Sequence, residues 1–173
     1  MSGHHTLSVL VENHPGVLSR VSGLFSRRGF NIDSLAVGPT ERDDQSRITI
    51  RVDCEQHSVD QVIKQLYKLI DVIKVSQLTA EEAIERELML VRVTASPTQR
   101  ADLIKLAEVF SARVVDVGPT SLLFECVEHP DKLHAFEEIL RPYGVKELVR
   151  TGRVAMRKAA PEAGRQRRMR VLA

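Results

Sequence analysis

The sequence has 173 residues, which is enough for one ordinary domain or two small ones. Hydrophobic residues make up 43% and charged residues 28%, which excludes a chain that is disordered throughout, and no apolar run approaches the roughly 20 residues that cross a bilayer. The net charge of +2 is uneven, because residues 157–173 hold six of the 25 basic residues and one of the 23 acidic residues. We therefore expect a flexible basic tail on a mildly acidic body.

The first half of the chain predicts the element order β-α-β-β-α-β. From Val17 onward, apolar side chains three and four residues apart predict a helix that ends at Gly29. Residues 47–52 alternate between apolar and polar, as a half-buried strand does, and Ser58 with Gln61 forms the capping-box pattern of a second helix. The strands expected in this half are residues 7–12, 31–37, 47–52 and 71–78.

The second half of the chain repeats this order. Pro97 and Pro130 stand where a first helical turn tolerates proline, so each is expected to open a helix. The tetrapeptide Val-Gly-Pro-Thr occurs at 37–40 and again at 117–120, after the second strand of each half, which supports two copies of one fold. The strands expected in this half are residues 88–94, 114–117, 121–127 and 145–156.

The repeated order predicts an α+β protein of two tandem ferredoxin-like (βαββαβ) units. Each unit should have an antiparallel four-stranded sheet with two helices on one face, and its first and third strands at the centre. Units of this size leave an open sheet face and edge strands, so we expect a homodimer formed through sheet faces or edges. The expected boundaries are 5–80 for the N-terminal unit, 81–87 for a charged linker, 88–156 for the C-terminal unit and 157–173 for the tail.

The sequence predicts neither catalytic residues nor a metal site. The histidines lack the spacing of helical metal pairs, and no phosphate-binding loop, dinucleotide fingerprint or nucleophile elbow occurs. Cys54 and Cys126 each lie near the end of the third strand of a repeat, where a small buried residue is expected. Two cysteines and a start without a secretory signal predict a cytoplasmic protein with free thiols.

The segment Asn13-His14-Pro15-Gly16 joins a central strand to the start of a helix. Unpaired N–H groups at such an end suit a carboxylate, Gly16 permits close approach, and Asn13 offers both a donor and an acceptor. These features fit a free amino acid, although a helix cap and a tight turn would by themselves also explain the loop. The equivalent loop, 96–99, has neither the Asn nor the Gly, which favours a ligand site in the first unit only.

The run Gly23-Leu-Phe-Ser-Arg-Arg-Gly-Phe-Asn-Ile-Asp-Ser-Leu35 and the residues before it resemble the N-terminal ACT domain of regulatory (small) subunits of acetolactate synthase, also called acetohydroxyacid synthase. Segments 65–76 and 86–91 fit the same family, and the resemblance covers residues 5–156. It implies a non-catalytic subunit that activates the catalytic (large) subunit and confers feedback inhibition by a branched-chain amino acid, usually valine. It also implies no cofactor on this chain, with thiamine diphosphate, Mg and FAD on the catalytic subunit.

The resemblance further implies an effector site. Its amino-acid-binding loop is matched by residues 13–16, and Asn31 matches an asparagine that reaches the ligand across a dimer interface. Gly38 falls at a position linked with feedback resistance. An apolar pocket for the effector is implied as well, with ordinary core packing as the alternative for its four residues. The implied effector residues are Asn13, His14, Pro15, Gly16, Asn31 and Gly38, with Val17, Leu18, Ile32 and Val37 for the pocket.

Two other functions stay open on the sequence. One is an ACT-domain sensor of amino acids that serves another pathway. The other is a nucleic-acid-binding protein of tandem ferredoxin-like units, which stack bases on aromatic residues of their central strands. The expected central strands 7–11 and 48–52 contain no aromatic residue, and the body of the chain is net acidic. We therefore expect neither a nucleic-acid partner nor a membrane partner.

Overall fold

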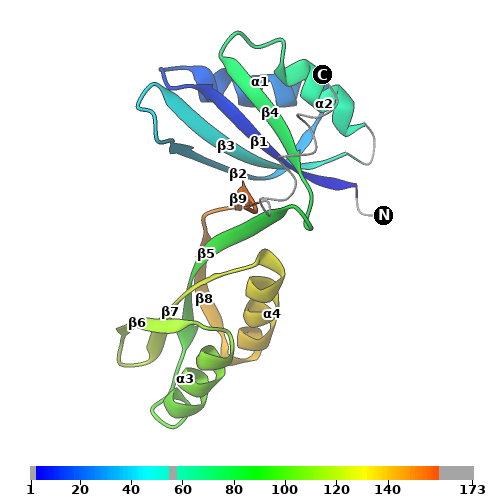
Figure 1. Ribbon diagram of the computed structural model, residues 1–173. Helices are drawn as coiled ribbons and strands as arrows, with labels where there is room; N and C mark the ends of the chain where they lie inside the picture. The colour runs from blue at the N-terminus through cyan, green and yellow to red at the C-terminus, as the bar shows by residue number, and fades with distance from the viewer. Residues whose placement is uncertain (1–2, 55–57, 160–173) are drawn as a thin grey trace.

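The computed structural model describes residues 3–54 and 58–159 and has two lobes (Figure 1). The N-terminal module contains β1 to β4 and the C-terminal module contains β5 to β9. Both modules follow the predicted order β-α-β-β-α-β, so the α+β class and the tandem ferredoxin-like arrangement are confirmed. The elements of the N-terminal module are β1 (His4–Glu12), α1 (Val17–Arg28), β2 (Asn31–Pro39), β3 (Gln45–Asp53), α2 (Val59–Leu66) and β4 (Val72–Leu78).

The N-terminal sheet has the order β2-β3-β1-β4 with antiparallel pairing throughout, so its first and third strands are central as predicted. Helices α1 and α2 cover one face of this sheet (Figure 1). Strand side chains alternate between faces, and Leu7, Val9 and Val11 of β1 point into the helix-covered core, where they are fully buried. The core residues of both helices pack on them.

The ends of the first two helices follow the sequence signals. Gly16 precedes α1 with a φ of 89°, and Gly29 follows it with a φ of 67°; both are left-handed conformations that glycine adopts readily. Ser58 caps α2, because its hydroxyl accepts a hydrogen bond from the N–H of Gln61 at 3.3 Å. Of these residues, Gly16 marks the point where the loop from β1 ends and α1 begins.

The C-terminal sheet has the order β6-β7-β5-β8, which corresponds strand for strand to the first sheet. Pro130 opens a helix as predicted, but the prediction for Pro97 is wrong, since that helix begins at Arg100. No helix in the described ranges is both long enough and apolar enough to span a membrane. The elements are β5 (Ala83–Thr94), α3 (Arg100–Val109), β6 (Arg113–Val117), β7 (Ser121–Glu128), α4 (Pro130–Leu140), a 3-10 turn (Arg141–Tyr143), β8 (Val145–Arg150) and β9 (Val154–Arg157).

Strand β9 is the main departure from the sequence-based expectation. The single strand expected over 145–156 is interrupted at Gly152, whose φ of 82° turns the chain, and the second sheet gains a fifth strand. This strand pairs with the first four residues of β5, forming a two-stranded ribbon of residues 83–86 and 154–157, here called the β5–β9 ribbon. The segment 81–87, expected as a linker, is therefore mostly strand. Of the expected tail, residues 160–173 lie outside the described residues.

The β5–β9 ribbon lies against the face of the N-terminal sheet that the helices leave open. Glu85 accepts a hydrogen bond from the Thr6 hydroxyl at 2.7 Å and forms an ion pair with Arg153 at 2.9 Å. The backbone N–H of Arg153 donates to the hydroxyl of Ser34 at 3.2 Å. The chain's own second module thus occupies part of the face where the sequence suggested a second copy, and β2 lies at the edge of the sheet.

Candidate functional site

The loop from Asn13 to Gly16 connects β1 to α1 at one end of the N-terminal sheet. Gly16 occupies the N-cap position, and no side chain of the described residues caps the helix, so within the described residues the N–H groups of its first turn have no capping partner. A Cβ built on Gly16 would meet only Nη1 of Arg20, at 3.8 Å, among the described residues. The backbone here is open to a small anionic group, which the unpaired N–H groups would favour.

Asn13 holds the loop against the hairpin between β2 and β3. Its side-chain N–H donates to the carbonyl of Asp43 at 3.0 Å, and its backbone N–H donates to the carbonyl of Asp44 at 2.8 Å. Its side-chain oxygen accepts no hydrogen bond from any described residue and can still accept one. A hollow of about 320 Å³ lies here, lined by Glu12, Asn13, His14, Asp44, Gln45 and Ile73.

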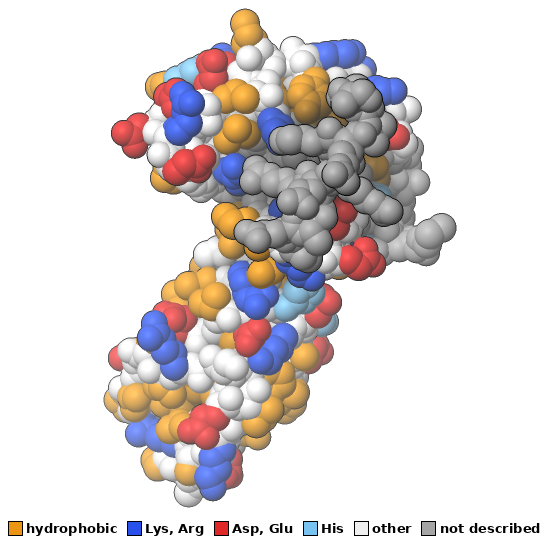
Figure 2. Space-filling view, in the orientation of Figure 1, with side chains coloured by type: hydrophobic (Ala, Val, Ile, Leu, Met, Phe, Trp, Pro, Cys, Tyr) orange, Lys and Arg blue, Asp and Glu red, His pale blue; other side chains and the backbone are white. Residues whose placement is uncertain are grey.

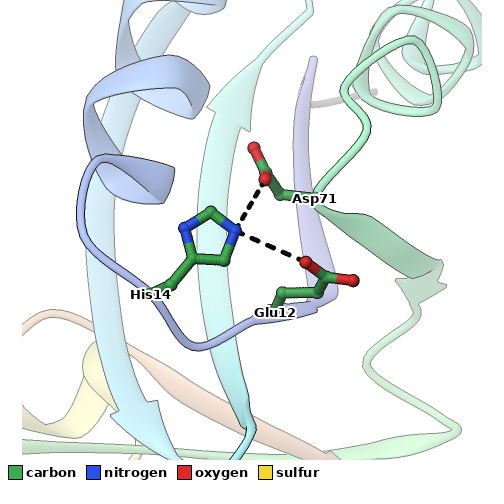
Figure 3. A group of neighbouring side chains, drawn as sticks. All are labelled: Glu12, His14 and Asp71. Carbon is green, nitrogen blue, oxygen red and sulfur yellow. Dashed lines mark ion pairs between the residues drawn. The ribbon is translucent and has the colours of Figure 1, made fainter.

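Glu12, His14 and Asp71 lie together where the loop meets the start of β4 (Figure 3). Nε2 of His14 lies 2.9 Å from a carboxylate oxygen of Asp71 and 3.4 Å from one of Glu12. Arg20 of α1 donates to both oxygens of Asp71, at 2.6 and 3.2 Å. The hydrogen bond from Arg20, and then the neighbouring charges of Arg20 and His14, hold the pKa of Asp71 below its usual value.

By ligand type alone, Glu12, His14 and Asp71 would suit a metal ion. The carboxylate of Asp71 is, however, already paired with Arg20, and a guanidinium at this distance repels a second cation. The imidazole of His14 already pairs with both carboxylates through its Nε2 atom. We therefore interpret the group as an ion-pair network that positions the loop.

The lowered pKa of Asp71 makes this network sensitive to acid. A carboxylate whose pKa is lowered in the folded state stabilises the fold above its ordinary pKa of about 4, and this contribution is lost as the pH falls. Asp71→Asn should therefore lower the urea midpoint of unfolding near neutral pH, and its difference from the wild type should shrink at about pH 3. Glu108→Gln, which removes an exposed carboxylate of α3, is the control. A difference that stayed the same at both pH values would contradict this role.

The equivalent loop of the C-terminal module makes its hydrogen bonds within the chain. The backbone N–H and the hydroxyl of Ser96 both donate to the side-chain oxygen of Gln99, at 3.2 and 2.9 Å. This turn delays the helix to Arg100, which explains why Pro97 does not open it. Arg100 donates to the carbonyls of Gly118 and Pro119, so side chains of the chain itself occupy this end of the sheet. The contrast supports a ligand site in the N-terminal module only.

Asn31 lies at the opposite end of the sheet from the loop. It begins β2 opposite Asp53, whereas Pro39 ends β2 opposite Ser46, at the end of the sheet where the loop lies. Eight residue steps of strand span roughly 26 Å, so Asn31 and the loop of the same chain cannot share one amino acid. The Asn31 side chain donates to Asp33 at 3.2 Å.

The four residues predicted for an apolar pocket are divided between the core and the surface. Val17 is buried in the core, and Ile32 packs against the same core. Leu18 is 43% exposed on α1, and Val37 is 50% exposed on β2, beside Gly38. Core packing therefore accounts for the first two, and only Leu18 and Val37 offer apolar surface to a ligand.

The sequence did not indicate Arg20 or Asp71 as part of this site. Arg20 lies beyond the predicted loop, and Asp71 is only the first residue of an expected strand. They are 51 residues apart, and their contact depends on β1 and β4 being neighbours in the sheet. The signal that could have found them is topological: the end of β1 and the start of β4 must lie side by side in an antiparallel pair.

Neither cysteine is placed to act as a nucleophile. Cys126 is buried and its thiol donates to the carbonyl of Phe110, while Cys54 is half-buried against the N-terminal core. Burial raises the pKa of both thiols, so the thiolate is disfavoured at neutral pH.

Comparisons with known proteins agree with this division into two modules. Residues 7–74 match the model of the "AHAS small subunit-like ACT domain", and residues 86–159 match that of the "Small subunit of acetolactate synthase". The chain is 57% identical over 152 residues to a probable acetolactate synthase small subunit of Archaeoglobus fulgidus, covering 88% of this chain and 95% of that protein. It is 51% identical to the acetolactate synthase small subunit of Mycolicibacterium smegmatis, covering 88% and 89%.

Among solved structures, the acetolactate synthase small subunit of Thermotoga maritima matches with a TM-score of 0.85 and 36% identity. The match covers 91% of this chain and 99% of that one, so it includes both modules. The repeated fold, the two family models and these relatives lead to one conclusion. The chain belongs to the family of acetolactate synthase small subunits, which are regulatory and not catalytic chains.

Proposed function

We propose that this chain activates the thiamine-diphosphate-dependent catalytic subunit of acetolactate synthase and makes it sensitive to feedback inhibition by a branched-chain amino acid, with valine as the expected effector. The complex would form in the cytoplasm, and thiamine diphosphate, Mg and FAD would bind to the catalytic subunit. Family membership supports the catalytic subunit as partner. The loop between β1 and α1 supports the effector.

One observation supports the proposed effector site: Asn31 and the Asn13–Gly16 loop lie at opposite ends of the sheet that has β2 as its edge strand. Asn31 begins this strand, and the Asn13–Gly16 loop lies at the end of the sheet where the strand finishes. Two copies that pair their β2 strands antiparallel about a two-fold axis would bring Asn31 of the partner subunit to the Pro39 end, near the loop. Each site then needs both chains, so the effector binds only to a dimer.

The groups at the loop match the parts of a free amino acid. The N–H groups of the first helical turn, with Arg20 beside Gly16, suit a carboxylate. The side-chain oxygen of Asn13 and the carboxylate of Glu12 suit an ammonium group. The exposed side chain of Leu18 offers an apolar contact, which favours an aliphatic effector.

A site shared by two chains also provides a route to inhibition. An effector changes activity only if it binds two conformations of the complex with different affinity. An amino acid that bridges two modules favours the dimer geometry that accommodates it. The catalytic subunit would be active with one geometry and less active with the other.

The shared site predicts that the chain is at least a dimer. Because β2 is an edge strand, its unpaired backbone groups are available to the same strand of a second copy. Sedimentation of the purified protein at micromolar concentration should show a dimer or a larger assembly, and added valine should stabilise it. A strict monomer that bound valine tightly would contradict the shared site.

Reconstitution tests the function as a whole. Acetolactate formation by the catalytic subunit from the same organism is measured alone, with this chain, and with this chain over a range of valine concentrations. Addition of the chain should raise the rate, and valine should then lower it. No change in rate on addition of the chain would refute activation. If the chain raised the rate but valine, leucine and isoleucine did not lower it, only the effector assignment would be refuted.

A further inference from the structure

The exposed side of the β5–β9 ribbon carries an apolar surface that the core does not use. In the ribbon, Ile84 pairs with Met156 and Arg86 pairs with Val154, so these four side chains lie on one side. Ile84, Val154 and Met156 are 49%, 53% and 72% exposed. On the opposite side of the ribbon, Ala83, Glu85 and Ala155 are buried.

This apolar surface continues onto the edge of the N-terminal sheet. Val37, Gly38 and Pro39 of β2 line a groove of about 560 Å³ together with the ribbon. Figure 2 shows hydrophobic side chains with Lys and Arg beside them at the waist between the two lobes. The groove, here called the waist groove, is lined by residues 36–39 and 154–159 with Arg47, Thr49, Ile84 and Arg86.

The charged residues that line the waist groove all carry positive charge. Four cations and no carboxylate occur among its described lining residues. Arg47, Arg86 and Lys158 donate to neutral oxygens, which are the hydroxyl of Ser8 and the backbone carbonyls of Glu85 and Glu81. Arg157 approaches Glu82 only to 3.9 Å, in an exposed pair. The cations are therefore available to carboxylates from outside.

This charge decides between three possible occupants. A second copy docked through the same groove would bring four cations against four cations, which costs binding energy. The chain's own residues 160–173 hold four arginines and one glutamate, so they are repelled as well. A partner with apolar side chains flanked by Asp or Glu fits both the apolar lining and the basic rim.

We infer that the waist groove is the docking surface for the catalytic subunit, through an apolar segment flanked by carboxylates. The inference rests on the proposed function and names the surface that it uses. Strand β2 contributes both Asn31, at its start, and the groove residues at its end. A structural change of β2 on effector binding would therefore alter the docking surface directly, because the same strand belongs to both.

Charged substitutions on the full-length chain test the groove. Met156→Glu places a charge in the apolar lining, and the double variant Arg86→Glu/Lys158→Glu reverses the rim. Val109→Glu is the matched control for the first, because Val109 on α3 is also 72% exposed, and Lys105→Glu on α3 controls for reversal of a charge. Affinity for the catalytic subunit is measured by interferometry, with valine binding to each variant alone as a check of the N-terminal module.

Both groove variants should bind the catalytic subunit about tenfold more weakly or worse, while the controls bind like the wild type. Binding of the wild type should also weaken as salt is raised. If the wild type and both groove variants bound the catalytic subunit with the same affinity, the waist groove would not be the docking surface, but the proposed function would stand. A wild type that does not bind the catalytic subunit at all would overturn the proposed function first. Loss of the dimer in Met156→Glu, or tighter binding by chain 1–159, would assign the groove to a second copy or to the tail.

Discussion

Asn31→Ala should leave activation of the catalytic subunit intact while raising the valine concentration for half-inhibition by about ten- to a hundredfold. A lost hydrogen bond to a charged group costs roughly 1.5–3 kcal/mol, and each 1.4 kcal/mol is tenfold in affinity. Asn31 is exposed at the start of β2 and its side chain donates to Asp33 of the same strand, so the fold should tolerate the change. The measurement is acetolactate formation against valine concentration.

The second module supplies a matched control for this variant. Arg113 begins β6, the counterpart of β2, and its exposed pair with Glu125 contributes little to stability. Arg113→Ala should change neither activation nor the valine response. If Asn31→Ala instead abolished activation and kept normal valine sensitivity, this end of β2 would be a contact with the catalytic subunit. Gly16→Asp should reduce sensitivity further, but its φ of 89° adds backbone strain, so Asn31 gives the cleaner result.

Glu85→Ala should destabilise the protein by roughly 3–5 kcal/mol, the usual cost of leaving one member of a buried ion pair alone. Glu85 is buried, and it holds both the Thr6 hydroxyl and the Arg153 guanidinium where the modules meet. Burial and the nearby charge of Arg153 already lower the pKa of Arg51, so removal of Glu85 leaves two cations together. Urea unfolding should show a lowered midpoint.

Glu82→Ala is the control for this loss, because Glu82 is exposed and its pair with Arg157 is long, at 3.9 Å. An exposed pair is worth about 0–1 kcal/mol, so the midpoint should change little. Glu85→Gln keeps the shape of the side chain and can still accept a hydrogen bond from Thr6. Its unfolding midpoint should therefore lie between those of Glu82→Ala and Glu85→Ala. If Glu85→Ala lowered the unfolding midpoint no more than Glu82→Ala does, the contact between the modules would contribute no stability.

The core of each module could be predicted from local patterns, while the ribbon could not. Leu7, Val9 and Val11 alternate, and the α1 residues repeat at helical spacing, so their period alone reveals the element. Residues 83–87 also alternate, but the inward positions include Glu85 and Glu87, which resemble a solvated linker. Their partners, Thr6, Arg150 and Arg153, come from distant segments, and only the fold brings them together.

The candidate site shows the same division. The loop was predictable because Asn13 and Gly16 carry their chemistry within four residues. The pairing of Arg20 with Asp71 depends on strand order, and the placement of Val17 and Ile32 depends on which side of a helix or strand faces the core. A motif gives the residue types of a site, whereas the contacts between distant segments decide which of them reach the ligand.

Strand β5 sets the orientation of one module relative to the other. Of its twelve residues, the first belong to the β5–β9 ribbon and the rest belong to the C-terminal sheet. Insertion of a single residue between Glu87 and Leu88 would exchange the two sides of the ribbon. Ala83 and Glu85 would turn outward, and Ile84 and Arg86 would meet the open face of the N-terminal sheet. Insertion of two residues would restore the sides but shift the modules by about 7 Å. Insertions in this strand are therefore expected to preserve the sides of the ribbon only when they add an even number of residues.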